Sequence, residues 1–234
     1  MESQTRIYAI GDVHGRRDLL AAAIAAVETD AQARSGDGRR FRIVLLGDYV
    51  DRGDDSRGVL DLLTHLRQRR DPDALVCLSG NHEAALLAFV ADPVGGASWL
   101  AMGGRQTLAS YGVRLTARAD AAALFAARDR FVAALGPHLT FLTTCLERIH
   151  RSGSVIFAHA GYDPDAAEAA QPDDVLLWGA PARALPQGMA LVHGHFAASA
   201  PAVGRDRIGI DTGAYHSGVL TVLRLDPAPG WLAP

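Results

Sequence analysis

The sequence contains no lysine, so all 23 basic side chains are arginines. This absence excludes a Walker-type phosphate loop and any mechanism that proceeds through a lysine Schiff base. Aromatic residues make up only 6% of the chain, which leaves few rings for stacking on nucleic-acid bases. A formal net charge of -3 also provides no basic surface for nucleic acids or anionic membranes. We therefore expect neither a nucleic acid nor a membrane as a partner.

Cysteines and long apolar runs are also scarce. Cys77 and Cys145 are too few for a disulfide framework and lack the spacing of a metal site. No apolar run approaches the roughly 18 residues of a membrane-spanning helix, and the polar N-terminus lacks a signal-peptide pattern. These absences predict a cytoplasmic protein. A length of 234 residues with 49% hydrophobic residues predicts a single domain spanning residues 1–234.

Short apolar runs alternate with amphipathic stretches in the first part of the chain, and the apolar runs end near glycines. This alternation predicts an α/β fold built in layers. The predicted strands cover residues 7–10, 43–46 and 75–78, and the predicted helices cover residues 18–29, 56–70 and 83–90.

The middle of the chain, at about residues 91–151, has a different pattern. Helical spacing covers residues 117–135 and 139–151, and Gly136-Pro137 between them is a typical helix stop and start. We interpret this segment as a mainly helical insertion. Beyond it, a proline-rich tail is expected at residues 227–234. Further strands are predicted at residues 155–158, 190–192, 208–210 and 219–225.

Polar residues of similar chemistry follow five of the predicted strands. The carboxyl ends of strands in an open α/β sheet meet at one crevice, so these side chains are expected to converge. Carboxylates, imidazoles and an amide, without any thiolate, favour Mn²⁺, Fe or Zn²⁺. Their number suggests two ions, with Asp48 as a bridge. The candidate ligands are Asp12, His14, Asp48, Asn81, His159 and His195.

The sequence around these residues forms five motifs in a fixed order. They are Gly11-Asp12-Val13-His14-Gly15, Gly47-Asp48-Tyr49-Val50-Asp51-Arg52-Gly53, Gly80-Asn81-His82-Glu83, His159-Ala160-Gly161 and Gly194-His195. Together they resemble the signature of the metallophosphoesterase superfamily, and most closely its phosphoprotein phosphatase branch of bacterial serine/threonine type. Residues 99–112 also resemble the helical insert of bacterial members, and residues 210–213 resemble their late strand.

The resemblance implies a fold and a set of roles. The fold is a calcineurin-like sandwich of two central mixed β-sheets flanked by helices. A hydroxide shared by two divalent ions, most often Mn²⁺, would attack phosphorus in line. One metal would be held by Asp12, His14 and Asp48, and the other by Asp48, Asn81, His159 and His195. His82 would be the general acid with Asp51 as its orienting partner, while Arg52 and Asn81 would bind the phosphate.

One position departs from the family pattern. Bacterial relatives usually carry a second phosphate-binding arginine two residues after a Leu-Trp pair, where this chain has Ala180. Arg183 is the candidate substitute for substrate binding. The departure concerns substrate affinity rather than the metal site. His193, two residues before His195, is expected to face away or to support a ligand, with direct metal contact as the alternative.

Three functions are compatible with these residues. The first is hydrolysis of phosphoserine or phosphothreonine, and by extension phosphotyrosine, in proteins. The second is hydrolysis of dinucleoside polyphosphates such as diadenosine tetraphosphate, or of small phosphoesters. The third is an inactive phosphoprotein-binding module, against which the complete ligand set and His82 argue. Asp51 and Glu83 favour the first, because the diadenosine enzymes typically differ there. The substrate, the native metal and the oligomeric state stay open.

Overall fold

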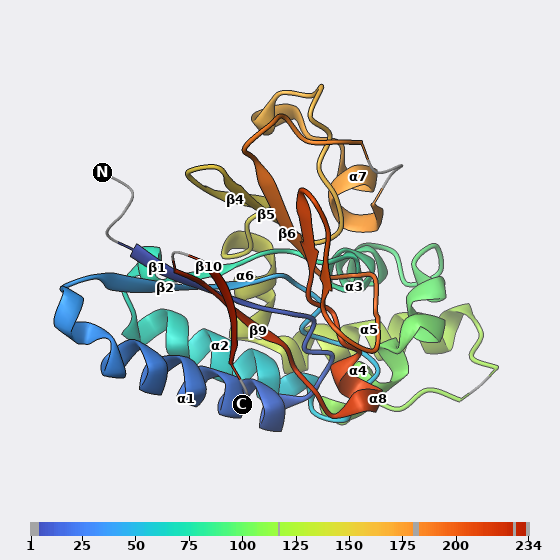
Figure 1. The fold of residues 1–234 in the computed structure, drawn as a ribbon. Helices are drawn as coiled ribbons and strands as arrows, with labels where there is room; N and C mark the ends of the chain where they lie inside the picture. The colour runs from blue at the N-terminus through green and yellow to red at the C-terminus, as the bar shows by residue number, and fades with distance from the viewer. Residues whose placement is uncertain (1–4, 117, 180–182, 227, 233–234) are drawn as a thin grey trace.

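A computed structural model describes residues 5–116, 118–179, 183–226 and 228–232 and contains two five-stranded sheets (Figure 1). The first sheet consists, in spatial order, of β10 (Ala228–Leu232), β9 (Val222–Asp226), β1 (Thr5–Ile10), β2 (Arg40–Leu45) and β3 (Leu75–Cys77). The second consists of β4 (Ile149–Ser152), β5 (Val155–Ala158), β6 (Ala190–His193), β8 (Arg207–Gly209) and β7 (Ala202–Val203). Both sheets are mixed, which confirms the predicted sandwich.

The first sheet is built from the strand and helix alternation that the sequence predicts. β1, β2 and β3 run parallel, and the connections between them contain α1 (Arg17–Ala33) and α2 (Ser56–Arg69). β9 returns antiparallel to β1. Because β1, β2 and β3 run in one direction, their carboxyl ends open at the same edge of the sheet.

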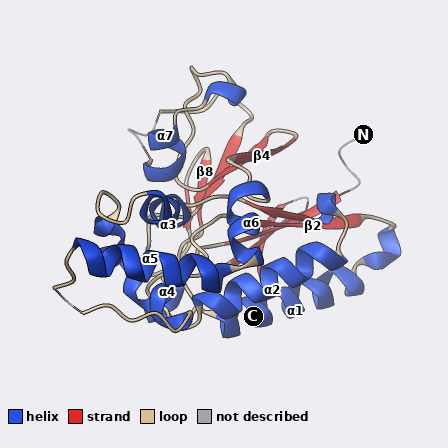
Figure 2. Cartoon of the chain, turned by 180° about the vertical axis from the view of Figure 1, so that it is seen from behind, coloured by secondary structure: helices blue, strands red, loops and turns tan. Residues whose placement is uncertain are grey.

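Alternate residues of the central strand face different layers. Ile7 and Ala9 pack with Phe157 and Val192 of the second sheet, so the two sheets share a dry apolar interior. Tyr8 and Ile10 instead join the core formed with the helices, to which α1 contributes Leu20, Ile24 and Val27. The two long helices α1 and α2 run side by side along this face of the first sheet (Figure 2). The alternation thus puts the second sheet on one face of β1 and the helices on the other.

The second sheet carries its own outer layer. β5, β6 and β8 are parallel, so residues that follow β5 and β6 leave the sheet at one end. The opposite face of the sheet packs against α7 (Asp173–Trp178), where Leu176 joins Ile156 and Leu191 in a small core. In Figure 1 this layer lies at the top, on the far side of the second sheet from α1 and α2.

The middle of the chain is mainly helical, as expected, but its end differs from the prediction. The helix expected at 139–151 ends at Thr144, and Ile149–Ser152 pairs antiparallel with β5 instead. The turn at Gly153 joins the two strands, and sheet pairing overrides the weak helical spacing. The helices here are α3 (Asn81–Ala91), η4 (Ala97–Met102), α4 (Gly104–Ser110), α5 (Ala121–Leu135) and α6 (Pro137–Thr144).

The expected proline-rich tail is also wrong, because residues 228–232 form the edge strand β10. A proline is tolerated on an edge strand, since no neighbour on that side needs its missing N–H, and Pro229 occupies such a position. The remaining short elements are α8 (Ala214–Ser217), η2 (Ser35–Asp37), η3 (Pro72–Ala74) and η5 (Glu168–Ala170). Among the described residues, no helix is both long enough and apolar enough to cross a bilayer.

Asp30 of α1 ties this helix to the first sheet. Its carboxylate accepts hydrogen bonds from Tyr8 Oη at 2.7 Å, Arg34 Nε at 3.1 Å and Arg224 Nη1 at 3.1 Å. Burial by itself would raise the pKa of Asp30, but the bonds from Tyr8 and Arg34 and the charge of Arg224 outweigh it and lower the pKa. The ionised form is therefore favoured in the folded state.

Substitution of Asp30 by asparagine is expected to lower the free energy of unfolding by about 1–2 kcal/mol at neutral pH. A depressed folded-state pKa stabilises the fold above the unfolded pKa of about 3.9, and that stabilisation disappears as the pH falls through the folded pKa. The difference between Asp30→Asn and the parent in urea unfolding should therefore shrink below about pH 4. Asp129→Asn, which alters an exposed carboxylate, is the control. A difference independent of pH would contradict this role.

Candidate metal centre

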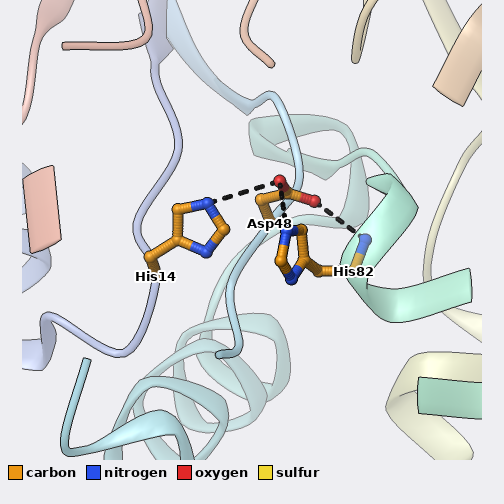
Figure 3. A group of neighbouring side chains, drawn as sticks. All are labelled: His14, Asp48 and His82. Atoms are coloured by element: carbon orange, nitrogen blue, oxygen red, sulfur yellow. Dashed lines mark hydrogen bonds and ion pairs between the residues drawn. The ribbon is translucent and has the colours of Figure 1, made fainter. Parts of the chain in front are cut away.

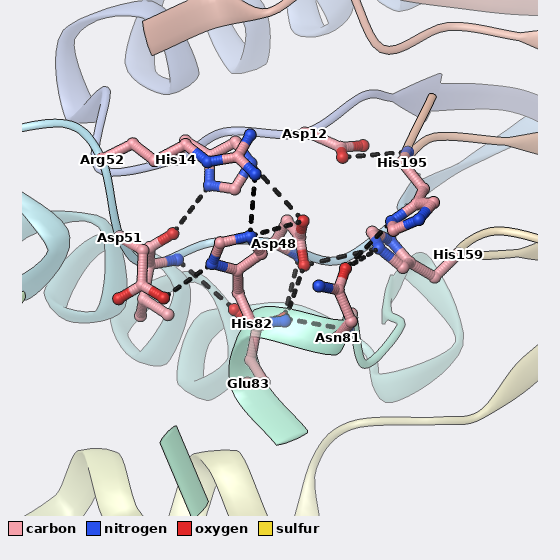
Figure 4. A network of polar contacts seen from close by, with 12 residues as sticks. Asp12, His14, Asp48, Asp51, Arg52, Asn81, His82, Glu83, His159 and His195 are labelled. Atoms are coloured by element: carbon pink, nitrogen blue, oxygen red, sulfur yellow. Dashed lines mark hydrogen bonds and ion pairs between the residues drawn. The ribbon is translucent and has the colours of Figure 1, made fainter. Parts of the chain in front are cut away.

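The predicted ligands converge where the ends of the two sheets meet (Figure 4). They come from the loops after β1, β2, β5 and β6 and from the first turn of α3. Most of the set is nearly inaccessible to solvent, and His195 and Arg52 are the half-buried members. The structure thus brings together Asp12, His14, Asp48, Asp51, Arg52, Asn81, His82, His159 and His195.

The backbone at this place adopts an unfavourable conformation. Among the described residues, every non-glycine residue with a positive φ belongs to this cluster. Such conformations cost free energy and are retained where a site needs them. Close packing adds to the constraint, because a Cβ at Gly194 would lie 1.9 Å from Asp12 Oδ1 and one at Gly80 would lie 2.1 Å from Asp48 Oδ1. The residues with positive φ are His14, Asp48, Asp51, Arg52 and His195.

His14 presents one free nitrogen to the cluster. Its Nδ1–H donates to the carbonyl of Val50 at 2.9 Å, which leaves the lone pair on Nε2. Nε2 is buried without a hydrogen-bond partner and lies 3.4 Å from Asp48 Oδ2 (Figure 3). Burial, and then the charges of His82 and Arg52, lower the pKa of His14 well below its ordinary value. A buried neutral imidazole with an unpartnered nitrogen suits a metal ligand.

A second group of ligands surrounds the side chain of Asn81. Asn81 Oδ1 lies 2.9 Å from His159 Nε2 and 3.0 Å from His195 Nδ1. His159 Nδ1–H donates to the carbonyl of Leu46 at 2.8 Å, so Nε2 carries the lone pair that faces Asn81. Burial lowers the pKa of both histidines to about 4, which keeps them neutral. Three electron-pair donors therefore point at one volume.

Asp48 lies between the two groups. One carboxylate oxygen lies 3.4 Å from His14 Nε2, and the other lies 3.4 Å from His159 Nε2. Within the described residues, two sets of side chains place ligand atoms close enough together to share an ion: His14, Asp48 and His82, and Asp48, His159 and His195. Burial raises the pKa of Asp48 to about 6, so its anion requires nearby positive charge.

Asp12 has the same need for a cation. Its Oδ2 accepts the backbone N–H of His195 at 3.0 Å, whereas Oδ1 is buried without a partner. Burial, and then the charges of Asp211 and Asp48, raise the pKa of Asp12 well above its ordinary value. Unpartnered atoms on Asp12 and His14, beside the anionic Asp48, are what a divalent metal centre would satisfy. The residues fit the predicted cofactor.

His82 lies within reach of the first set, but both of its ring nitrogens already have partners, so it stands beside the centre rather than serving as a ligand. Its Nδ1 lies 2.7 Å from Asp51 Oδ2, and its Nε2 lies 3.1 Å from Arg52 Nη2 and 3.8 Å from Asp48 Oδ2. Burial alone would lower the pKa of His82, but the Asp51 hydrogen bond and the carboxylate charges outweigh it and raise the pKa. An imidazole oriented by a buried carboxylate is the arrangement of a general acid.

Glu83 holds the loop that carries Asp48. Its two carboxylate oxygens accept the backbone N–H groups of Asp48, Tyr49 and Gly80 at 2.8, 2.8 and 2.9 Å. All of these groups are buried, so the bonds are strong. Glu83 belongs to a predicted motif, but its role in holding this loop could not be read from the motif. Tyr215, which was not among the predicted site residues, stacks under Arg52, with the guanidinium carbon 5.1 Å from the ring centre.

Two predicted residues lie apart from the cluster. Arg183 is 61% exposed and forms ion pairs with Asp163 and Asp165. The position of the absent arginine, Ala180, lies outside the described residues. His193 Nδ1–H donates to the Gly194 carbonyl at 3.0 Å, and the ring packs edge-on against Phe196. The described contacts therefore place neither Arg183 nor His193 in the two ligand sets.

Solved structures with the same fold carry the names of different phosphoester hydrolases. A "putative diadenosine tetraphosphatase" superposes with a TM-score of 0.61 at 22% identity, covering 97% of this chain and 95% of that chain. A mutant cold-active protein tyrosine phosphatase gives 0.58 at 16% identity, covering 98% and 82%. A protein serine/threonine phosphatase from Saccharomyces cerevisiae gives 0.57 at 15% identity, covering 99% and 81%. At these identities the likeness shows the fold alone.

Sequence comparison also points to phosphoester hydrolases. A symmetrical bis(5'-nucleosyl)-tetraphosphatase of Klebsiella pneumoniae subsp. pneumoniae is 42% identical over 84 residues, which are 36% of this chain. The match spans only 26% of that relative's length. The family profile for calcineurin-like phosphoesterases matches residues 5–199, which is more than half of the chain. The ordered ligand motifs, the two-sheet sandwich and this match together establish that the chain belongs to the calcineurin-like phosphoesterase family.

Proposed function

We propose that this phosphoesterase is a metal-dependent phosphatase that hydrolyses phosphoserine and phosphothreonine, and by extension phosphotyrosine, in proteins. Membership of the family supports the hydrolysis of phosphoesters in general. The observation that supports phosphoproteins as the substrate is the pair of His82 Nδ1 and Asp51 Oδ2, which lie 2.7 Å apart beside Asp48.

The ligand sets suit two divalent ions that share Asp48. Carboxylate, imidazole and amide donors without thiolates favour Mn²⁺, with Fe and Zn²⁺ as alternatives. When bound, the ions supply positive charge to the phosphoryl oxygens and lower the pKa of attacking water.

The surroundings of Arg52 support a role in binding the phosphoryl group. Its guanidinium is half-buried between the Tyr215 ring and His82 Nε2. A planar guanidinium can donate two parallel hydrogen bonds to phosphate oxygens. Donation to phosphate would take Arg52 away from His82 Nε2. The doubly protonated imidazolium, held at Nδ1 by Asp51, could then give its Nε2 proton to the leaving oxygen.

The leaving group distinguishes the candidate substrates. A serine or threonine alkoxide is a poor leaving group and needs a proton as the P–O bond breaks, whereas a polyphosphate leaves readily as an anion. An acid held by a fully buried carboxylate is therefore of greatest use with alkyl phosphoesters. The need of an alkoxide for a proton favours phosphoprotein substrates over dinucleoside polyphosphates.

Two exposed aromatic side chains favour a second candidate, the hydrolysis of dinucleoside polyphosphates. Trp178 and Phe196 are 51% and 52% exposed, and their rings lie 5.9 Å and 4.8 Å from the ring of His195. Exposed rings beside a phosphate site can stack on a nucleobase. The names of the Klebsiella relative and of one solved structure agree with this alternative.

Side-by-side turnover with Mn²⁺ tests the proposal. Phosphoserine and phosphothreonine peptides, diadenosine tetraphosphate and mononucleotides should be compared at equal concentrations. The peptides should show kcat/KM values about tenfold or more above those of the dinucleotide. The double variant Trp178→Ala, Phe196→Ala should lower dinucleotide turnover and leave peptide turnover largely unchanged. A strong preference of the parent protein for the dinucleotide would overturn the phosphoprotein assignment in favour of the second candidate.

A further inference from the structure

The carboxylate of Asp51 is held by more than its histidine partner. Oδ2 accepts from Trp99 Nε1 at 2.7 Å in addition to the contact with His82 Nδ1 at 2.7 Å. Oδ1 accepts from Thr107 Oγ1 at 2.6 Å. Asp51, Trp99 and Thr107 are all fully buried, so water does not compete for these bonds. Three donors from different elements thus converge on one carboxylate.

The two added donors come from the helical middle of the chain. Trp99 lies in η4 and Thr107 in α4, and between them the chain passes close to the Asp51 loop at Gly103. Gly103 has a φ of 119°, and a Cβ there would lie 2.5 Å from the backbone nitrogen of Arg52. A side chain at this position would push the segment away. The segment is therefore fitted to the loop that carries Asp51 and Arg52.

Trp99 itself has little freedom to move. Its ring packs against Phe89 at 5.1 Å and against Phe131 at 5.9 Å between ring centres. Thr107 Oγ1 is likewise fixed, because it lies 3.0 Å from Ser56 Oγ and 2.9 Å from the backbone nitrogen of Asp51. Contacts with other buried residues thus fix the positions of both donors relative to the carboxylate.

We propose that Trp99 and Thr107 are positioning residues for the acid step, which they serve by fixing the Asp51 carboxylate that orients His82. With its other lone pairs occupied, Asp51 Oδ2 can accept only along the direction of His82 Nδ1–H. That bond keeps a proton on Nδ1 and turns Nε2, which carries the second proton in the acid form, toward Asp48 and Arg52, where the leaving oxygen would lie. The inference rests on the proposed role of His82 as the acid.

The test uses variants that remove a donor. Trp99→Phe deletes the indole N–H and keeps an aromatic ring, and Thr107→Val deletes the hydroxyl. Thr107→Ser restores it. The matched controls are Trp231→Phe on the exposed edge strand and Thr64→Val, whose hydroxyl is buried without a partner. Each variant is assayed with Mn²⁺ on an alkyl phosphoester, a phosphoserine peptide, and on an aryl phosphoester, para-nitrophenyl phosphate.

The expected signature is a loss that depends on the leaving group. In Trp99→Phe and Thr107→Val, kcat for the peptide should fall about tenfold or more, with KM changed less than about twofold. Turnover of para-nitrophenyl phosphate should fall much less, because nitrophenolate leaves without a proton. Thr107→Ser should recover most peptide activity. Both controls should match the parent, and melting temperatures should show that every variant is folded.

A readout independent of turnover follows the tautomer directly. In the parent, imidazole ¹⁵N spectra should show His82 protonated at Nδ1, and the indole N–H of Trp99 should be shielded from exchange. Thr107→Val and Trp99→Phe should give a mixture of His82 tautomers. Equal losses on both substrates, or an unchanged tautomer, would overturn the positioning role. A parent protein that hydrolyses neither substrate while its His82 tautomer responds to the variants would instead overturn the proposed function.

Discussion

Asp48→Asn is expected to lower phosphatase turnover by about 10³-fold or more and to reduce the binding of divalent metal. Asp48 is the residue shared by the two ligand sets, with its oxygens 3.4 Å from His14 Nε2 and from His159 Nε2. Asparagine keeps the shape of the side chain but presents one N–H₂ group where a second electron pair is needed. Metal content by mass spectrometry and turnover of para-nitrophenyl phosphate with Mn²⁺ measure the two effects.

Asp54→Asn is the matched control for this prediction. Asp54 belongs to the same acidic stretch, but its side chain is exposed and outside both ligand sets. It should retain the metal content and the turnover of the parent. Full activity and full metal content in Asp48→Asn would mean that the centre does not depend on a shared carboxylate.

His82→Asn is expected to cost about 10²- to 10⁴-fold in kcat on a phosphoserine peptide. The substitution removes Nε2, the only His82 atom that can reach a leaving oxygen, while an amide can still bond to Asp51. Loss on para-nitrophenyl phosphate should be smaller, because that leaving group needs less help from an acid. Steady-state kinetics on both substrates give the ratio.

Metal binding should survive in His82→Asn, which separates the acid from the ligands. The Nε2 atom of His82 lies 3.8 Å from Asp48 Oδ2, whereas Asn81 Oδ1 lies 2.9 Å from His159 Nε2 and 3.0 Å from His195 Nδ1. His65→Asn, on the exposed side of α2, controls for the loss of a histidine. If His82→Asn kept parent activity on the peptide, another residue would have to supply the proton.

The sequence could predict the layered fold because its strands are short apolar runs that end in polar motifs. Residues 155–158 match β5 in full, and the strands predicted at 7–10 and 75–78 differ from β1 and β3 by one or two residues. It could also predict that Asp48 and the histidines would meet, since parallel strands bring their carboxyl ends to one edge. Both predictions were possible because the apolar runs and the polar motifs that follow them are each contained in a short stretch of the sequence.

Features that depend on distant contacts could not be predicted in this way. Ile149–Ser152 is a strand because β5 offers it an edge, and residues 228–232 are a strand because β9 does. The bonds of Trp99 and Thr107 to Asp51 join residues 48 and 56 positions apart. No spacing rule links such residues. Arg183 pairs with Asp163 and Asp165 instead of joining the site, and these pairs likewise depend on how the surrounding loops fold.

Anomalous diffraction can reveal whether two metal ions share Asp48. Crystals grown with Mn²⁺ should show two anomalous peaks about 3.5–4 Å apart on either side of the Asp48 carboxylate. One peak should lie against His14 and Asp12, and the other against Asn81, His159 and His195. A single peak, or peaks away from Asp48, would contradict this account.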